Sequence, residues 1–158
     1  MLLYHGSNTE VREPRLLETQ RELDFGTGFY TTSDYEQAKK WAVRTKKIRN
    51  NGASAVSFYE FDTDRTGELL VKRFLKPDLE WLEFVAANRR MHRTDIYDLI
   101  IGPVADDRTV PTLVLYLDGY ISAENAIERL LPMKLKDQYT FKSQKALDLL
   151  TFTKVVYV

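Results

Sequence analysis

Apolar and polar residues alternate in short blocks along the chain, some with the two-residue period of a strand and others with the spacing of a helix. The clearest helix is predicted over residues 33–50. Ser33 stands at its N-cap position and Glu36 follows three residues later, which is the pattern of a capping box. Its apolar positions recur at helical spacing: Tyr35, Ala38, Trp41, Ala42 and Ile48.

Three further helices are predicted over residues 78–92, 122–131 (with Ser122 as N-cap) and 143–150. Apolar or alternating runs predict strands at residues 2–5, 29–32, 54–62, 68–74, 97–104, 111–118, 138–141 and 151–158. Short strands mixed irregularly with helices indicate an α+β fold rather than a regular parallel βαβ fold. No repeat, low-complexity run or linker interrupts the chain, so we predict a single domain over residues 1–158.

Composition narrows the classes of function. The 158 residues are 44% hydrophobic and 29% charged, an ordinary globular balance. The absence of cysteine excludes disulfides, thiolate zinc sites and a cysteine nucleophile. With 23 basic and 23 acidic residues, a large nonspecific nucleic-acid surface is not expected. The N-terminus has no signal-peptide pattern and no segment is long enough to span a membrane, so we predict a cytoplasmic protein without membrane association. Export by a route that needs no cleaved signal stays open.

The run LDFGTGFYTT at residues 23–32 combines two glycines with two adjacent aromatic residues. In one interpretation a glycine turn leads into a strand whose aromatic side chains fill the core. In the other, Phe29 and Tyr30 form the wall of a flat slot in which a planar ring stacks on Tyr30, so that the ring and not the hydroxyl matters. The match to a Rossmann phosphate loop is poor, because a third glycine is missing and a strand, not a helix, is predicted after Gly28.

His5 lies where the first predicted strand meets Gly6 and Ser7. A buried histidine bonded to backbone is the common role for such a residue, but the glycine also allows a ligand to approach the backbone closely. The second histidine, His92, ends a basic helix, where its charge would complement the helix dipole. No HExxH, CxxC or clustered His/Asp spacing is present, so no metal site is predicted.

Polar residues of the second half are weaker candidates. Asn88 and Arg89 near a helix end, and Asp106 and Asp107 after a buried strand, are either surface and turn residues or ligand contacts. Gln138 opens a short strand and would share one face with Thr140. The basic run at residues 44–50 most simply matches a helix C-terminus, and contact with phosphate is its second interpretation.

Four motifs together resemble a known family: LYHGS, LDFGTGFYTTSDYEQAKKWA, YDLIIGPVADDRT and DQYTFKSQKALDLLTF. They are similar to the bacterial domain-of-unknown-function 3990 family, which is regarded as a branch of the ADP-ribosyltransferase-like superfamily. The His-Gly step and the Gly-x-Gly-Phe-Tyr-x-Thr run are shared with transferases of the poly-ADP-ribose polymerase and diphtheria-toxin type. The resemblance extends over essentially the whole chain and implies a split two-layered β-sheet core with flanking helices that clasps NAD.

The resemblance implies a role for each matching residue. His5 would bond the ribose of NAD, Gly6 would hold the nicotinamide carboxamide through its backbone, and Tyr30 would stack on the nicotinamide. Gln138 stands where the family type usually has a catalytic glutamate, so His5, Tyr30 and Gln138 are the expected catalytic residues. The expected NAD-binding residues are His5, Gly6, Ser7, Gly28, Phe29, Tyr30, Asn88, Arg89 and Asp106.

The function that the resemblance implies is NAD-dependent mono-ADP-ribosyl transfer to a macromolecular acceptor. A bacterial toxin of a toxin–antitoxin or phage-defence pair is the expected setting, with an antitoxin protein among the expected partners. Three alternatives stay open: an NAD glycohydrolase, an RNA 2′-phosphotransferase and an inactive NAD-binding pseudoenzyme. Because Gln138 carries no charge, Asp137, Asp106 and Asp107 are the candidates for a missing carboxylate.

Overall fold

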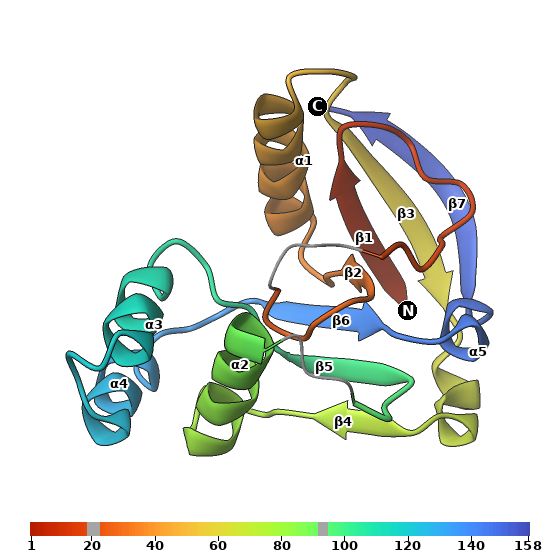
Figure 1. Ribbon diagram of the computed structural model, residues 1–158. Coiled ribbons are helices and arrows are strands. Elements are labelled where there is room, and N and C mark those ends of the chain that lie inside the picture. Colours follow the sequence, from red (N-terminus) through yellow and green to blue (C-terminus); the bar gives the residue numbers. More distant parts are fainter. Residues whose placement is uncertain (19–22, 92–94) are drawn as a thin grey trace.

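Two β-sheets form the centre of the computed structural model, which describes residues 1–18, 23–91 and 95–158 (Figure 1). The three-stranded sheet has the order β1-β3-β7, and the four-stranded sheet has the order β2-β6-β5-β4. Neighbouring strands are antiparallel except for the parallel pair β4 and β5. The strand bounds are β1 Leu2–Ser7, β2 Phe29–Thr31, β3 Ala55–Phe61, β4 Val71–Arg73, β5 Leu99–Pro103, β6 Asp137–Phe141 and β7 Leu150–Tyr157.

Helices flank both sheets, and the α+β prediction is confirmed in this coarse form. Helix α1 packs on the three-stranded sheet, while α2, α3 and α4 lie beside the four-stranded sheet (Figure 1). The helix bounds are α1 Tyr35–Arg49, the 3₁₀ helix η1 Thr63–Glu68, α2 Leu79–Met91, α3 Val110–Leu117, α4 Ala123–Leu130 and α5 Gln144–Leu147. His92, which was predicted to end a basic helix, lies outside the described residues.

One predicted strand is wrong, because residues 110–117 form helix α3. A continuous apolar run does not distinguish a buried strand from a buried helix. Pro111 decides the outcome, since its fixed φ suits the first helical turn and it has no N–H for a sheet. A turn at Gly119, with φ +79°, then follows the helix.

The start of α1 also differs from the prediction by one residue. Asp34, not Ser33, is the N-cap, and its carboxylate accepts the Gln37 N–H at 2.8 Å. Ser33 instead donates its hydroxyl to Asp137, while its backbone N–H donates to Asp137 Oδ1 at 2.8 Å. The cap of α4 at Ser122 is confirmed, with Ser122 Oγ accepting the Asn125 N–H at 3.2 Å.

Each face of the four-stranded sheet covers a separate apolar core. The core between the two sheets is built from Leu3, Phe29, Tyr59, Phe61, Leu99, Ile101, Phe141, Ala146, Leu147 and Leu149. The core beneath the helices is built from Phe25, Phe74, Trp81, Leu82, Phe84, Val85, Ile100, Leu113, Ala126 and Leu130. Because side chains alternate along a strand, Phe29 of β2 joins the first core while the next residue, Tyr30, packs against the second. This alternation determines which candidate residues meet.

Candidate functional site

The two sheets are joined where β1 and β2 touch and then part. A single bridge connects them: the Tyr4 N–H donates to Thr32 O at 2.9 Å and the Thr32 N–H donates to Tyr4 O at 3.0 Å. Continued antiparallel pairing would bring Gly6 opposite Tyr30. The ladder stops instead, and the Tyr30 carbonyl accepts a hydrogen bond from the side chain of His5 at 2.7 Å. The imidazole therefore closes the junction at the point where the backbones separate.

The contact with Tyr30 fixes the state of the His5 ring. A carbonyl oxygen only accepts, so Nδ1 carries the proton. Burial lowers the pKa of His5, the Tyr30 carbonyl opposes this, and nearby Arg49 lowers it further. A neutral ring with its proton on Nδ1 leaves Nε2 as an acceptor. The ring also stacks on Phe29, with centroids 4.4 Å apart.

Gly6 has a packing role and exposes a backbone edge. A Cβ at this position would lie 1.9 Å from Ala38 O, so only glycine allows α1 to approach β1 this closely. The alternation of the ladder points the Gly6 N–H and C=O to the same edge as those of Tyr4. No described hydrogen bond reaches them there. Ser7 is buried beyond it, and its hydroxyl contacts Asn8 Oδ1 at 3.4 Å.

Tyr30 and Phe29 point to opposite faces of β2. Phe29 lies in the core between the sheets and meets Tyr59 edge to face, so it supports the His5 ring rather than lining a slot. The Tyr30 ring packs against the core beneath the helices. Its hydroxyl donates to Gly26 O at 2.6 Å and accepts the Phe25 N–H at 3.1 Å. Burial, together with the charge of Asp24, raises the pKa of Tyr30, which is therefore protonated at physiological pH.

Gly28 is needed where the turn before β2 meets β6. A Cβ on Gly28 would lie 2.6 Å from Thr140 Cγ2 and 2.8 Å from Phe141 O. The residue thus permits a close approach of two chain segments, as its neighbour Gly26 permits a turn with φ +75°. Gly28 and Gly26 therefore have structural roles in the turn that leads into Tyr30.

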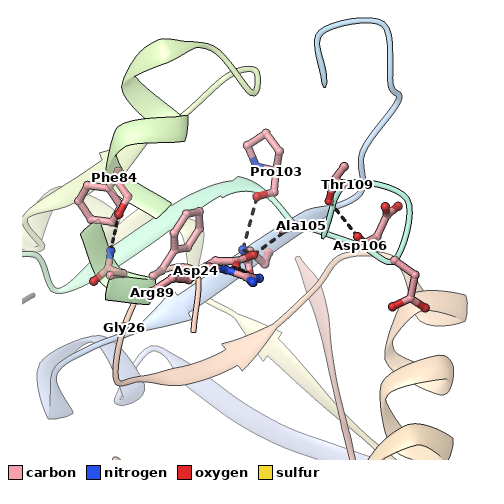
Figure 2. Close-up of polar contacts among 12 residues, drawn as sticks. Asp24, Gly26, Phe84, Arg89, Pro103, Ala105, Asp106 and Thr109 are labelled. Atoms are coloured by element: carbon pink, nitrogen blue, oxygen red, sulfur yellow. Dashed lines mark hydrogen bonds and ion pairs between the residues drawn. The ribbon is translucent and has the colours of Figure 1, made fainter. Parts of the chain in front are cut away.

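Gln138 is the centre of a buried polar cluster that the sequence did not predict. Its side-chain amide donates to Asp24 Oδ2 at 3.4 Å and to Pro103 O at 3.4 Å, and the residue is 2% exposed. Figure 2 shows the Asp24 carboxylate between Arg89 and the backbone of Ala105. Arg89 donates to Asp24 Oδ1 through Nε at 2.8 Å and Nη2 at 2.5 Å, and the Ala105 N–H donates to Oδ2 at 3.0 Å.

The other polar candidates are occupied elsewhere. Asn88 donates from Nδ2 to Phe84 O at 3.0 Å, and its buried Oδ1 has no partner among the described residues. Asp106 accepts the Arg108 backbone N–H at 2.9 Å and pairs with the Arg108 guanidinium, contacts typical of a turn residue. Burial alone would raise the pKa of Asp106, but the Arg108 contacts hold it below its usual range.

The remaining candidate carboxylates also lie away from Gln138's amide. Asp107 pairs with Arg44 at 3.1 Å on the surface. Asp137 accepts from the Thr32 hydroxyl at 3.1 Å and from Ser33, at the start of α1. Within the described residues, Asp24 is the carboxylate that contacts Gln138, and it was not among the residues predicted from sequence.

The structure therefore divides the predicted site into two linked groups. His5, Gly6 and Phe29 lie at the junction of the sheets. Tyr30 and Gln138 share the opposite face of the four-stranded sheet, since Tyr30 pairs with Thr140 and Gln138 lies two residues along the same strand. Tyr30 belongs to both groups, because its carbonyl holds His5 while its ring lies on the side of Gln138.

A family model described as "Protein of unknown function (DUF3990)" matches residues 1–152. The chain belongs to this family. The match covers all of the candidate residues, from His5 to Gln138. No curated protein and no solved structure shows significant similarity to the DUF3990 chain.

Two further properties of the DUF3990 chain bear on its ligands. Among the described residues no helix has the length and apolar character needed to cross a membrane, and no three His, Asp or Glu side chains gather to hold a metal ion. A pocket of about 670 Å³ lies apart from the junction, between η1, β4 and the C-terminal end of β3. Its lining includes Phe61, Leu69, Arg73 and Tyr139 but none of the predicted site residues.

Proposed function

We propose that the chain is an NAD-dependent mono-ADP-ribosyltransferase with an ADP-ribosyltransferase-like fold, and that its site lies at the junction of the two sheets. The observation that carries the proposal is the unpaired edge of Gly6 beside His5. A primary carboxamide offers one acceptor and two donors, and it matches a neighbouring backbone N–H and C=O. Nicotinamide carries such a group, as the sequence resemblance expects.

The proposed reaction breaks the bond between ribose C1′ and the nicotinamide nitrogen. The bonding electrons go to the ring nitrogen, which becomes neutral, and positive charge develops on the ribose. A nucleophilic atom of the acceptor then bonds to C1′ and loses its proton. Groups that fix the sugar and favour the developing charge lower the barrier.

The chain's own residues take three parts in this proposal. His5 Nε2 accepts a hydrogen bond from a ribose hydroxyl, because the ring proton lies on Nδ1, where it forms the hydrogen bond to Tyr30 O. The rigidly held Tyr30 ring provides the stacking surface for nicotinamide. Gln138 orients the second ribose hydroxyl, although its amide supplies no negative charge. The macromolecular acceptor, the antitoxin partner and the role as a toxin are parts of the proposal that rest on the resemblance alone.

A second candidate is a pseudoenzyme that binds NAD or ADP-ribose without turnover. It is favoured by Gln138, a neutral amide that is 2% exposed and already engaged by Asp24 and Pro103. Binding would then use the carboxamide edge and the aromatic surface, and the chemical step would be absent.

The two candidates are separated by one set of labelled-NAD assays. We expect purified protein to bind NAD and to transfer label from its adenylate phosphate to a component of cell lysate, with nicotinamide released in equal amount. Protease and nuclease treatment then identify the class of acceptor. Nicotinamide release without an acceptor indicates the glycohydrolase, binding without release indicates the pseudoenzyme, and no NAD binding overturns the proposal. His5→Ala serves as the inactive variant and Tyr120→Phe, at a 78% exposed position, as the matched control.

A further inference from the structure

The orientation of the Gln138 amide follows from its neighbours. Its Nε2 lies 3.4 Å from Asp24 Oδ2 and 3.4 Å from Pro103 O, and both of these oxygens are acceptors. The reversed amide would place Oε1 against two acceptors and lose both hydrogen bonds. The chemistry of the cluster therefore determines which end of the amide faces Asp24.

Asp24 is itself held by two other segments of the chain. Arg89, on α2, donates two hydrogen bonds to Oδ1, and the Ala105 N–H, in the loop after β5, donates one to Oδ2. The Asp24 side chain is 7% exposed, so water does not compete freely for its oxygens. Oδ2 is thereby fixed in position relative to β6, which carries Gln138.

We propose that Asp24 is a positioning residue, which fixes the Gln138 amide so that Oε1 is presented as an acceptor to the nicotinamide ribose. Together the two residues take the place of one glutamate: Gln138 gives the acceptor oxygen and Asp24 sets its direction. No described group donates to Oε1, although the side chain is almost fully buried. The proposal depends on the proposed transferase function for its ligand, but not for the contact between the two side chains.

The same geometry predicts that a glutamate at position 138 is unfavourable while Asp24 is present. Two carboxylates at this separation repel each other, so one of them binds a proton at the cost of stability. Exchanging both residues, in Asp24→Asn with Gln138→Glu, keeps the net charge and restores a donor–acceptor pair. The double variant therefore distinguishes a specific pairing from general damage to the core.

The first experiment measures the Gln138 amide without any NAD chemistry. In ¹⁵N-labelled protein, Gln138→Leu identifies the side-chain NH₂ signals of Gln138. We expect these protons to exchange slowly in the wild type, and to shift and exchange at least about tenfold faster in Asp24→Asn. Asp106→Asn is the control, because Asp106 pairs with Arg108 instead. Unchanged Gln138 signals in folded Asp24→Asn would overturn the proposal whether or not the protein uses NAD.

The second experiment follows stability and nicotinamide release in the exchanged variants. In Gln138→Glu the introduced carboxyl lies beside Asp24 and has a raised folded-state pKa, so the deficit in melting temperature is full at high pH and disappears as the pH falls toward about 4.3. We expect Gln138→Glu to lose about tenfold or more in kcat with a smaller change in KM. We expect the double variant to recover kcat and to lose the pH-dependent part of the stability deficit, while the loss of the Asp24 carboxylate from Arg89 and Ala105 keeps it less stable than the wild type.

Two results would contradict the proposal directly. One is a Gln138→Glu variant as stable and active as the wild type, and the other is a double variant with the kcat and the pH-dependent stability deficit of the single one. If the wild type itself shows no NAD turnover, the proposed transferase function fails. The amide signals and the melting temperatures would still decide whether Asp24 controls Gln138, so the two failures are distinguishable.

Discussion

The His5 imidazole donates a hydrogen bond from Nδ1–H to the backbone carbonyl of Tyr30, with 2.7 Å between Nδ1 and O, at the point where β1 and β2 separate. The contact replaces the ladder hydrogen bond that continued pairing would supply. It fixes the tautomer of His5 and the backbone position of Tyr30. The geometry of the two residues is therefore coupled, although the His5 ring stacks on Phe29 and the Tyr30 ring packs against the core beneath the helices.

The first prediction concerns the titration of His5. Its pKa is lowered mainly by burial, so the folded state binds the imidazole proton less readily than the unfolded state. A lowered pKa contributes stability that is full above the unfolded value of about 6.5 and is lost as the pH falls toward the folded value. We expect the C2 proton of His5 to titrate below pH 6.5 in NMR spectra, and the wild type to melt at a lower temperature at about pH 5 than at about pH 7.5.

The chain has two histidines, so the matched variant is His92→Gln. It leaves one imidazole signal, which identifies His5 in the spectrum. A remaining signal that titrates at or above about 6.5 would mean that His5 is not desolvated at the junction, contrary to the structure.

The second prediction concerns the hydroxyl of Tyr30, to which the sequence assigned no role. Removing it in Tyr30→Phe leaves the Phe25 N–H and Gly26 O without their partner in a partly buried site. We expect a loss of about 1–3 kcal/mol in the free energy of unfolding. Tyr120→Phe, at a 78% exposed position, should change it by less than about 0.5 kcal/mol. Urea denaturation measures both free energies of unfolding. Equal losses in the two variants would show that the Tyr30 hydroxyl does not stabilise the fold.

Tyr30→Ala tests the ring rather than the hydroxyl. If nicotinamide stacks on Tyr30, folded Tyr30→Ala should bind NAD more weakly by about 1 kcal/mol or more, while Tyr30→Phe keeps most of the affinity per folded molecule. Calorimetry at a temperature where both variants are folded separates binding from stability. Equal affinity of the wild type and Tyr30→Ala would leave the aromatic run as core packing alone.

Local signals in the sequence located α4 with its Ser122 cap and α1 to within one residue of its cap, because caps and helical spacing lie within a few neighbouring residues. The same holds for β6, which begins one residue before the prediction. Residues 111–118 show the limit of such signals. Their apolar run fits a buried strand and a buried helix equally, and packing against α4 and α2 lies outside the local pattern.

The candidate site shows a different limit. Gln138 was predicted from its strand position, but its partner Asp24 is 114 residues away in the chain. Asp24 precedes a glycine turn, where an aspartate needs no special explanation. No one-dimensional pattern joins a turn, a helix side chain and the loop after β5 into one cluster. Only the fold brings Asp24, Arg89 and Ala105 together.

The third prediction compares a buried ion pair with an exposed one. Arg89→Gln leaves the Asp24 carboxylate, 7% exposed, without its cation. Breaking a buried pair in this way costs about 3–5 kcal/mol of stability. Arg65→Gln removes a pair with Glu68 in which both side chains are about half exposed, and such pairs contribute little to stability because water screens them. Similar midpoints of urea unfolding for the two variants would show that Asp24 is not buried as the structure has it.

The final prediction tests the packing role of Gly6. A Cβ at Gly6 would lie 1.9 Å from Ala38 O and 2.8 Å from Ala42 N, both of them backbone atoms that cannot rotate away. Gly6→Ala should therefore push α1 from β1, and we expect a loss of stability of about 3 kcal/mol or more. Gly67→Ala is the matched control, because no atom lies within 4 Å of its added Cβ. An unchanged melting temperature for Gly6→Ala would contradict the packing of α1 on β1. Ala38→Gly and Ala42→Gly leave both backbone atoms in place, so neither should rescue Gly6→Ala, and recovery in either double variant would show that side-chain crowding is the cause instead.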